Sequence, residues 1–417
     1  NPKNMKDKLL CMAIWLILCT HMSAQGWSSI QEHGVLPTNT AVENTKNLQK
    51  AIDMMAGKGG TLFIEPTEGG YPIDGGLILR RNVSLTGVHG PTGRGTATND
   101  RRKPTGSLFI IRDKEKPFIT VESATQIRGI QFYYPEQAFD KPDNIIPYPA
   151  TIQMSQENAV QGVTLSCLTF YGEYMAMDFR AKEPQICEQI LFEHCYGYPL
   201  SGRFIAIDRC YDVPRILHCH VNPANMREFG RSYHRSVIDE VVRQKTYTYW
   251  IDHTDNAQLM DLFTFGAHGG IYLGAETYGQ LTNFNFDCVC IGIHKLGSQW
   301  KNRNWQISQG SIIANAGEKL ESIHPILIEG IGHTSISNVE AFSGDNGALT
   351  NWASSWDYMT VTSGATISLS NCRMSGYSSA KPINAHPDAK IYAAGCIDKN
   401  NEFFEIRPLD IQENQGR

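Results

Sequence analysis

Short apolar strands separated by turns recur along most of the chain, and this repeat constrains the fold more than any other feature. Equivalent points recur from residue 127 to the C-terminal part of the sequence, at Ile127–Phe132, Val163–Leu165, Ile190–Phe192, Ile216–Leu217, Leu262–Phe263, Phe284–Phe286, Ile307, Ile336 and Ile367. Most steps are roughly 20 to 35 residues long, which is the period of solenoid repeats. The longest step runs from Ile216 to Leu262.

A second apolar strand follows many of these points after a turn, at Ala176–Asp178, Ile205–Ile207, Trp250–Ile251, Ile271–Leu273, Ile291–Ile293 and Ile326–Ile328. One such unit cannot bury its apolar side alone, so successive units must stack into a continuous core. The pattern therefore predicts an all-β, single-stranded parallel β-helix. The alternative is a β-sandwich, but its strands need not repeat in this strand–turn–strand unit.

One segment is predicted to be a helix. From residue 45 to 56, Leu48, Ala51, Ile52 and Met55 fall on one face at helical spacing, and glycine at 57 ends the pattern. We expect this helix to cap the N-terminal end of the solenoid.

The sequence around this helix resembles the N-terminal entry of the pectate-lyase-like β-helix superfamily. The resemblance rests on Gly34-Val-Leu before the helix and on three segments after it, Gly59-Gly-Thr-Leu-Phe-Ile-Glu-Pro, Tyr71-Pro-Ile and Val83-Ser-Leu-Thr-Gly. It is specific over residues 30–90 and generic, through the rhythm of the coils, over 120–375. The resemblance implies a right-handed β-helix with a capping helix, acting outside the cytoplasm on a polysaccharide such as plant pectin.

The first residues are expected to direct export. Lys6 and Lys8 form a basic start, Leu9–Cys19 is an apolar run, and Ala24 offers a cleavage site. We therefore predict a signal peptide over 1–24, a single β-helix domain over 25–417, and a periplasmic or extracellular location. The apolar run is too short to span a bilayer comfortably, so no transmembrane segment is predicted.

Composition narrows the choice of partners. A net charge of −5 argues against nucleic acid as the main partner. A monomer or weak oligomer is expected. The sequence contains 11 cysteines, several of them inside strand-like apolar runs where Cys acts as a small hydrophobic residue, so no disulfide pattern is predicted.

The longest step contains an inserted segment over residues 222–246. Its valines fall on one helical face, and the rest of the segment is rich in charge, including Arg243. Insertions in solenoids emerge as loops and often build the binding face. We expect this segment to leave the solenoid and form a wall over the groove, with a solvated decorative helix as the alternative.

Three aspartates occupy equivalent positions when the second strands are aligned by sequence. They are Asp178, Asp208 and Asp252, and we predict them to be the catalytic residues. The same alignment continues through Gly274, His294 and Glu329. Because neighbouring coils stack about 4.8 Å apart, such residues form a ladder on the outer face. Stacked carboxylates raise one another's pKa, and glycosidic cleavage needs one protonated and one ionised carboxyl group.

Basic and aromatic residues in the same middle coils are the predicted substrate-binding groups. Arginine binds carboxylates through two hydrogen bonds, which suits a uronic acid, and aromatic faces stack on sugar rings. The candidates are Arg203, Arg209, Arg243, His253, His268, His294, Tyr233, Tyr249 and Trp250.

These features predict an exported glycoside hydrolase that cleaves a pectin-like or other plant-type polysaccharide or oligosaccharide with paired carboxylates. The alternatives are a lyase that cleaves uronate-containing glycans by β-elimination, and a non-catalytic carbohydrate-binding β-helix. Ala267-His-Gly-Gly is only faintly similar to the polygalacturonase Gly-His-Gly coil, and that family's Asp pair and Arg-Ile-Lys are missing. No cofactor or metal is predicted, with Ca²⁺ on the aspartate column as the alternative.

Overall fold

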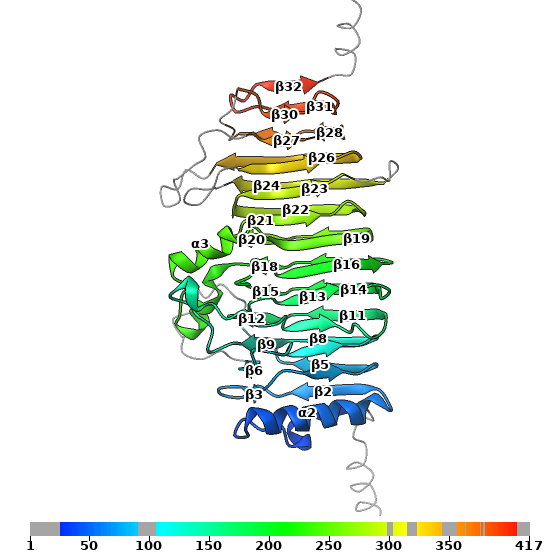
Figure 1. Ribbon diagram of the computed structural model, residues 1–417, viewed down its shortest axis with the longest axis vertical. Helices are drawn as coiled ribbons and strands as arrows, with labels where there is room; N and C mark the ends of the chain where they lie inside the picture. The colour runs from blue at the N-terminus through cyan, green and yellow to red at the C-terminus, as the bar shows by residue number, and fades with distance from the viewer. Residues whose placement is uncertain are drawn as a thin grey trace, which may run out of the picture.

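The computed structural model describes residues 26–90, 106–297, 303–314, 323–343, 357–362, 364–375, 377 and 380–406. The signal peptide predicted at 1–24 lies outside these residues. The strands stack as the rungs of one elongated solenoid (Figure 1), and every strand pair in the described part is parallel except that of β31 with β32. The predicted parallel β-helix is therefore confirmed, and two packed antiparallel sheets are excluded.

Each coil contributes to three sheets, which we call S1, S2 and S3 in the order in which the chain visits them. S1 contains β1 (Trp27–Ser29), β2 (Gly60–Ile64), β5 (Val83–Gly87), β8 (Thr125–Arg128), β11 (Val160–Ser166), β14 (Cys187–Glu193), β17 (Arg215–Leu217), β28 (Thr366–Ser370) and β31 (Lys390–Ile397). S2 contains β3 (Tyr71–Ile73), β6 (Ser107–Ile111), β9 (Ile130–Tyr133), β12 (Thr169–Tyr171), β15 (Tyr196–Gly197), β18 (His220–Val221), β20 (Phe263–Phe265) and β29 (Arg373–Met374).

S3 contains β4 (Leu77–Leu79), β7 (Ile119–Val121), β10 (Ile152–Met154), β13 (Met177–Arg180), β21 (Gly269–Leu273), β23 (Ile291–Leu296), β25 (His324–Glu329), β27 (Met359–Val361) and β30 (Ile383–Ala385). Two long strands run from S3 into S1, namely β16 (Ile205–Tyr211) and β19 (Tyr247–Met260). Three run from S1 into S2, namely β22 (Thr277–Val289), β24 (Asn304–Ala314) and β26 (His333–Ser343).

Single residues in the left-handed backbone region bend these long strands at the corners. Asn283, Gln309 and Asn338 take φ values of 54°, 55° and 53° on consecutive coils, between the S1 and S2 parts of their strands. A left-handed residue turns the chain sharply without a loop, and Asn tolerates that conformation well. On these coils the corner from S1 to S2 is therefore tight, whereas residues 222–246 leave the solenoid at the corner from S2 to S3.

Alternate residues of each strand point inward and stack from coil to coil. On S3, Ile205, Tyr249, Ile271, Ile293 and Ile326 occupy equivalent positions and are fully buried. Each buried side chain of this size stabilises the fold by about 1.5–3 kcal/mol relative to its exposed state. The ladder is what holds the coils in register.

Helix α2 (Ala41–Ala56) covers the N-terminal end of the solenoid, at the bottom of Figure 1. The capping role predicted for residues 45–56 is confirmed, but the helix begins four residues earlier. Thr40 is its N-cap, and its hydroxyl accepts a hydrogen bond from the Glu43 amide at 3.2 Å. This cap satisfies a free donor of the first turn, which the apolar spacing alone does not reveal. Leu48 and Ile52 are fully buried against the first coil.

The nine described cysteines are all free thiols, and most are buried. Cys187 and Cys210 are partners in register on neighbouring coils, inside the core cluster. These cysteines pack as small hydrophobic residues, as the sequence predicts.

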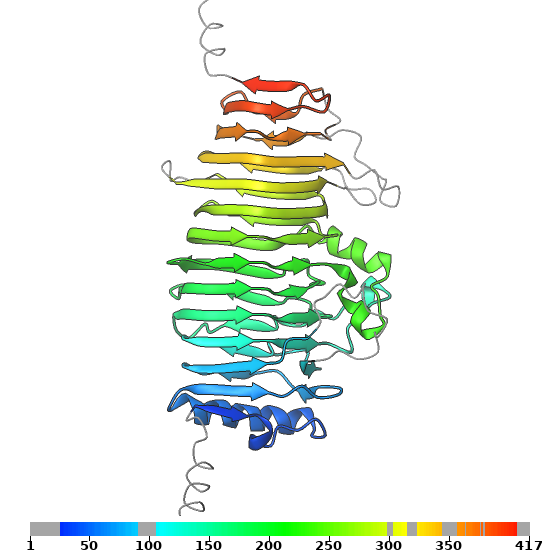
Figure 2. The same ribbon diagram turned by 180° about the vertical axis from the view of Figure 1, so that it is seen from behind.

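The inserted segment contains η3 (Pro223–Phe229) and α3 (Arg235–Arg243), and it leaves the solenoid between β18 and β19 (Figure 2). The other short helices are η1 (Gln31–His33) and η2 (Pro142–Asn144), and β32 (Phe403–Ile406) ends the described chain. No helix within the described ranges is long and apolar enough to cross a membrane.

Candidate active site

The outer surface of S3 carries two parallel columns of side chains in the middle coils. Asp208 and Asp252 are exact register partners of β16 and β19, and both side chains are partly exposed on the outer face. The second column begins with Trp250, two residues before Asp252 on β19, and continues through its partners in register, Tyr272 of β21 and His294 of β23. The predicted pairing of the two aspartates is therefore present in the fold.

Asp178 does not share the register of the other two aspartates, so that part of the prediction is wrong. Its strand partner is Ala206, whereas Asp208 is the partner of Arg180. The segments Ala-Met-Asp and Ala-Ile-Asp are similar in sequence, but their strands begin at different distances from the aspartate. A shift of two residues keeps a side chain on the same face but moves it about 6.6 Å along the strand. Asp178 instead forms a two-point ion pair with Arg180, at 2.8 and 2.6 Å.

His253 joins Asp208 and Asp252 into one cluster. Its Nδ1 lies 2.7 Å from Asp208 Oδ1 and 3.7 Å from Asp252 Oδ1, and its backbone amide donates to Asp252 Oδ1 at 3.0 Å. The residue has a φ of 38°, and this left-handed bend just after Asp252 brings the imidazole back over Asp208. Glu276 completes the cluster from the next coil, 3.5 Å from His253 Nε2.

The surroundings of this cluster shift two pKa values upward. Burial raises the pKa of Asp252 above the usual aspartate range, and this effect outweighs the nearby His253, which lowers it. Burial alone would lower the pKa of His253, but its hydrogen bond to Asp208 and the neighbouring carboxylates raise it overall. Both shifts favour the protonated form of the group concerned, the carboxylic acid of Asp252 and the imidazolium of His253.

The Asp252 carboxylate lies directly over Gly274 on the next coil. A Cβ added at Gly274 would be 2.0 Å from Asp252 Oδ1 and 2.5 Å from its Cγ. Only a residue without a side chain leaves the carboxylate in this position.

We therefore expect Gly274→Ala to displace the Asp252 carboxylate without removing it. If the position of this group matters, kcat should fall by about 10- to 100-fold, because misplacement of a reacting group by about 1 Å has effects of this size. Thermal unfolding and turnover of the variant would be measured together. Gly57→Ala is a matched control for the glycine change, since its backbone has a φ of −68° and no heavy atom lies within 4 Å of a Cβ there. Full activity in Gly274→Ala would contradict the assignment.

Lys295 lies beside this cluster but points into the core. It is the strand partner of Leu273 and is 5% exposed, and its ammonium donates to the Leu296 carbonyl. Burial lowers the pKa of Lys295 to about 8, and the charge of Asp252 partly opposes this shift. A cation is thus buried two coils away from Asp252, where the charges of the two groups still interact.

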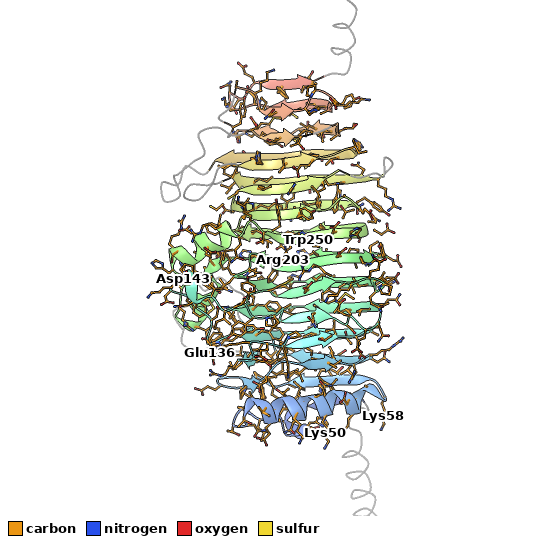
Figure 3. All side chains as sticks on the ribbon, viewed as in Figure 1. Lys50, Lys58, Glu136, Asp143, Arg203 and Trp250 are labelled. Atoms are coloured by element: carbon orange, nitrogen blue, oxygen red, sulfur yellow. The ribbon has the colours of Figure 1, made fainter. Side chains whose placement is uncertain are left out.

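The second column provides a flat aromatic surface. The rings of Trp250 and Tyr272 are stacked, with centroids 5.4 Å apart and an interplanar angle of 4°. The Arg203 guanidinium lies 5.5 Å from the Trp250 ring, and Figure 3 labels both residues on successive coils near the middle of the stack. Arg203 Nε is buried without a hydrogen-bond partner among the described atoms. This arrangement offers a ring-stacking surface next to a cation that has donor capacity to spare.

A hydrogen-bonded chain follows along the same face. Tyr247 Oη lies 2.6 Å from His294 Nδ1, and His294 Nε2 lies 2.6 Å from Glu329 Oε2. The Tyr247 ring reaches across one coil because Gly269 has no side chain, and a Cβ there would be 2.1 Å from the ring. His268 is buried at the edge of this chain, and burial together with Lys245 and His294 lowers its pKa to about 4.

Comparison with solved structures identifies the architecture. DFA-IIIase from Arthrobacter chlorophenolicus A6, solved without its lid and in complex with GF2, superposes with a TM-score of 0.53 at 9% identity over 89% of this chain and 93% of that chain. The chain is a right-handed parallel β-helix. The resemblance of residues 30–90 to β-helix proteins is thereby confirmed at the level of the fold.

Two further β-helix structures are similar to this chain more loosely. They are the GH87 α-1,3-glucanase of Streptomyces thermodiastaticus strain HF3-3, with a TM-score of 0.45 at 10% identity over 91% of this chain and 70% of that chain, and an exopolygalacturonase of Thermotoga maritima, with a TM-score of 0.42 at 9% identity over 91% and 93%. No protein-family model matches the sequence, and no curated protein matches it either.

The β-helix brings only part of the predicted binding set to S3. Arg203, Trp250, His253, His268 and His294 lie on or beside this face, as described above. Tyr249 does not, because it points into the core with no exposed surface, and its hydroxyl donates to the Cys219 and Phe263 carbonyls. Strand parity explains this: with Trp250 facing outward, its neighbour must face inward.

Three other predicted binding residues point away from the aspartate cluster. Arg209 follows Asp208, but its Nε donates to the Gln185 carbonyl on the preceding coil. Arg243 is exposed on α3 and pairs with Glu240 at 2.9 Å. Tyr233 is buried between Phe139 and Tyr198. In each case the side chain already serves the local structure, so sequence position in the middle coils was an insufficient guide.

The insertion borders S3 at its edge with S2, opposite the end that carries Asp208 and Asp252. Val242 of α3 packs with Cys290 and Ile291 and against Tyr247 and Leu327. The helix therefore stands beside the aromatic and histidine part of the face. It forms a side wall there, whereas the other side of the insertion faces S2.

Sequence reasoning did not identify Lys295 or Glu276. Lys295 interrupts an alternation of inward isoleucines at 291 and 293, and a lysine in such an inward position is itself a signal of function. Glu276 follows a turn, and nothing in its local pattern indicates that it approaches His253. Within the residues described, no group of three or more His, Cys, Asp or Glu side chains is arranged to hold a metal ion.

Proposed function

We propose that the chain is an exported glycan-cleaving enzyme, a glycoside hydrolase whose acid and partner carboxylate are Asp252 and Asp208. The observation that supports this most strongly is the pairing of the two aspartates in register on the outer face, with His253 in contact with both. The TM-score of 0.53 with DFA-IIIase supports the fold alone, so the chemistry rests on this site.

The roles of the two carboxyl groups follow from their surroundings. Asp252 has the raised pKa and is the proton donor to the glycosidic oxygen. Asp208 lies 2.7 Å from His253 Nδ1 and is assigned the role of the partner carboxylate. The Oδ1 atoms of the two aspartates both approach His253 Nδ1, at 2.7 and 3.7 Å, so these oxygens are at most 6.4 Å apart. The two aspartates are partners in register on adjacent strands, which stack about 4.8 Å apart, and such a pair fits the roughly 5–5.5 Å of retaining enzymes better than the wider inverting arrangement.

In a retaining reaction, the Asp208 carboxylate attacks the anomeric carbon while Asp252 gives its proton to the departing oxygen. This forms a glycosyl ester on Asp208 and releases the first sugar fragment. Asp252, now ionised, takes a proton from water, and the resulting hydroxide oxygen displaces Asp208 from the anomeric carbon. Both carboxyl groups return to their starting states.

The substrate proposed is a glycan that contains a carboxylate sugar, such as pectin. Arg203 supplies a guanidinium with an unused donor, and Trp250 with Tyr272 supplies the surface on which a ring stacks. Export to the periplasm or the medium, where such polymers are found, is proposed from residues 1–24.

The pH dependence of kcat/KM should report on Asp252. Because its pKa is raised, the protonated and active form persists above the usual aspartate range and is lost as the pH rises through the raised value. We expect activity to be highest in the acidic range and to fall toward neutral pH. With an aryl glycoside whose leaving group needs no protonation, this alkaline limb should disappear. An unchanged limb would assign it to another group.

β-Elimination is the second candidate chemistry. His268 is neutral at pH values above about 4, and its Nδ1 is buried without a hydrogen-bond partner among the described atoms, so it could accept a proton. A lyase would leave an unsaturated uronate, which absorbs in the ultraviolet. Screening pectic polysaccharides for new reducing ends and for this absorbance separates the two reactions, and binding without either product would indicate a non-catalytic β-helix.

A further inference from the structure

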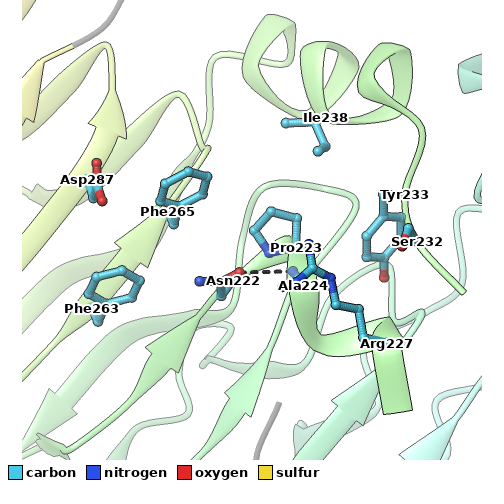
Figure 4. Close-up of a pocket in the computed structure, with 10 residues that line it drawn as sticks. All are labelled: Asn222, Pro223, Ala224, Arg227, Ser232, Tyr233, Ile238, Phe263, Phe265 and Asp287. Carbon is cyan, nitrogen blue, oxygen red and sulfur yellow. Dashed lines mark hydrogen bonds between the residues drawn. The ribbon is translucent and has the colours of Figure 1, made fainter. Parts of the chain in front are cut away.

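A second pocket lies on S2, under the insertion and separate from the aspartate cluster on S3. It has a volume of about 420 Å³. Figure 4 shows Phe263 and Phe265 of β20 on one side, Ile238 of α3 above, and Tyr233 with Arg227 on the opposite side. None of the residues proposed for cleavage lines it.

The wall of this pocket is fixed in place by contacts with the neighbouring coils. Phe229 stacks on Tyr133 with ring centroids 3.9 Å apart, and the amide of His234 donates to the Phe139 carbonyl at 2.7 Å. Val237 of α3 is fully buried. A ligand would therefore enter a site that is already formed, at little cost in ordering the protein.

The floor of the pocket is formed by two aromatic side chains of one strand, β20. Phe263 has His220 stacked on one face, at 4.2 Å and 10°. Phe265 lies two residues further along the same face of β20, and its partner in register on the next coil is Asp287. Both phenylalanine rings are partly exposed, in positions on S2 that solvent-facing side chains occupy.

The polar groups of the pocket are balanced in charge. Its lining contains one basic side chain, Arg227, and one acidic side chain, Asp287, together with Asn222 and Ser232. A few hydrogen-bonding groups around an apolar floor are typical of small-molecule sites. The pocket has no excess of positive charge that would select an acidic sugar.

We propose that this pocket binds a neutral sugar unit of a glycan, with the ring on Phe263 and Phe265 and the hydroxyls on Arg227, Asp287 and Asn222. The proposal rests on the proposed function only for the choice of glycans as the ligand class. The site would hold a neutral part of the polymer while a different part occupies S3.

The test uses the full chain carrying Asp208→Asn and Asp252→Asn, so that no probe is cleaved. Short oligosaccharides of xylose, galactose, arabinose, fructose and glucose, and oligogalacturonates for comparison, are titrated by isothermal calorimetry. At least one neutral series should bind. Phe265→Ala and Arg227→Ala should each weaken that binding about tenfold, as truncation of a central contact does. Phe403→Ala, which removes an 80% exposed ring on β32, is the matched control and should change nothing.

The proposal is overturned if no neutral series binds, or if Phe265→Ala and Arg227→Ala both bind as tightly as the parent. Arg227 is exposed, so its variant keeps the test valid if the phenylalanine variant does not fold. The result is distinguishable from that for S3. Neutral-sugar binding without any cleavage by the native chain would remove the proposed function alone, and cleavage without such binding would remove only this pocket.

Discussion

Asp252→Asn is expected to lower kcat by about 10²–10⁴-fold, which is the usual contribution of a positioned proton donor. Asparagine matches the carboxyl group in shape but cannot give its proton to the leaving oxygen. The carboxyl group is partly exposed and lies over Gly274, so the substitution should leave folding intact. Turnover on the identified glycan and thermal unfolding are the two measurements.

Asp208→Asn should have an effect of similar size, because it removes the partner carboxylate and the hydrogen bond to His253. Asp178→Asn is the internal control, since Asp178 lies out of register and is paired with Arg180. It should lose activity by less than about tenfold, on the scale of a surface ion pair worth up to about 1 kcal/mol. Equal losses in all three variants would mean that general negative charge on S3 matters, and not the pair.

Lys295→Met is expected to stabilise the protein by about 2–4 kcal/mol at neutral pH. Burial lowers the pKa of Lys295 from 10.5 to about 8, and each pKa unit corresponds to about 1.4 kcal/mol. Methionine would also pack against Leu273 and Ile328, its partners in register. Chemical denaturation at pH 7 measures the change in the free energy of unfolding.

The pH dependence of the stability of the native chain is a second test of the effect of Lys295. Below about pH 8 the lysine is charged in both folded and unfolded states, so the full burial cost is present. As the pH rises from about 8 toward 10.5, the folded chain loses this proton first and the cost disappears, so this group makes stability increase. Lys295→Met should lack that increase, whereas the exposed Lys390→Met should keep it and change stability by less than about 0.5 kcal/mol.

Removal of this cation should also reach the active site. The Asp252 charge opposes the lowering of the Lys295 pKa, so by reciprocity the loss of the ammonium two coils away should let Asp252 hold its proton more tightly. The alkaline limb of kcat/KM should therefore move to higher pH in Lys295→Met. If Lys295→Met is less stable than the native chain, other contacts of the ammonium must offset the cost of burying its charge.

The fold was predictable because the same pattern of apolar strands and turns recurs in every coil of a solenoid. Because each coil has apolar strands at similar spacing, a strand that is misassigned in one coil does not change the predicted architecture. The start of the capping helix was less accessible, because Thr40 acts through one hydrogen bond and leaves no periodic signal.

The site was predictable where the sequence shows which strand residues face outward and at which residue each strand begins. Asp208 and Asp252 each lie three residues after the inward partners Ile205 and Tyr249. Asp178 lies only one residue after the equivalent Met177, so it falls out of register. The inward position of Tyr249 could have been predicted from the alternation of inward and outward residues along a strand. Glu276 and the reach of Tyr247 over Gly269 depend on turns and on the absence of a side chain one coil away, which no local pattern encodes.

Product analysis with the native chain and the Asp208→Asn/Asp252→Asn double variant tests the central claim most directly. Both proteins are incubated with pectic polysaccharides and their oligosaccharides, and new reducing ends and unsaturated uronates are measured in parallel. We predict new reducing ends without ultraviolet absorbance from the native chain, and none from the double variant. Unsaturated products from the native chain, or undiminished release of reducing ends by the double variant, would contradict hydrolysis by this pair.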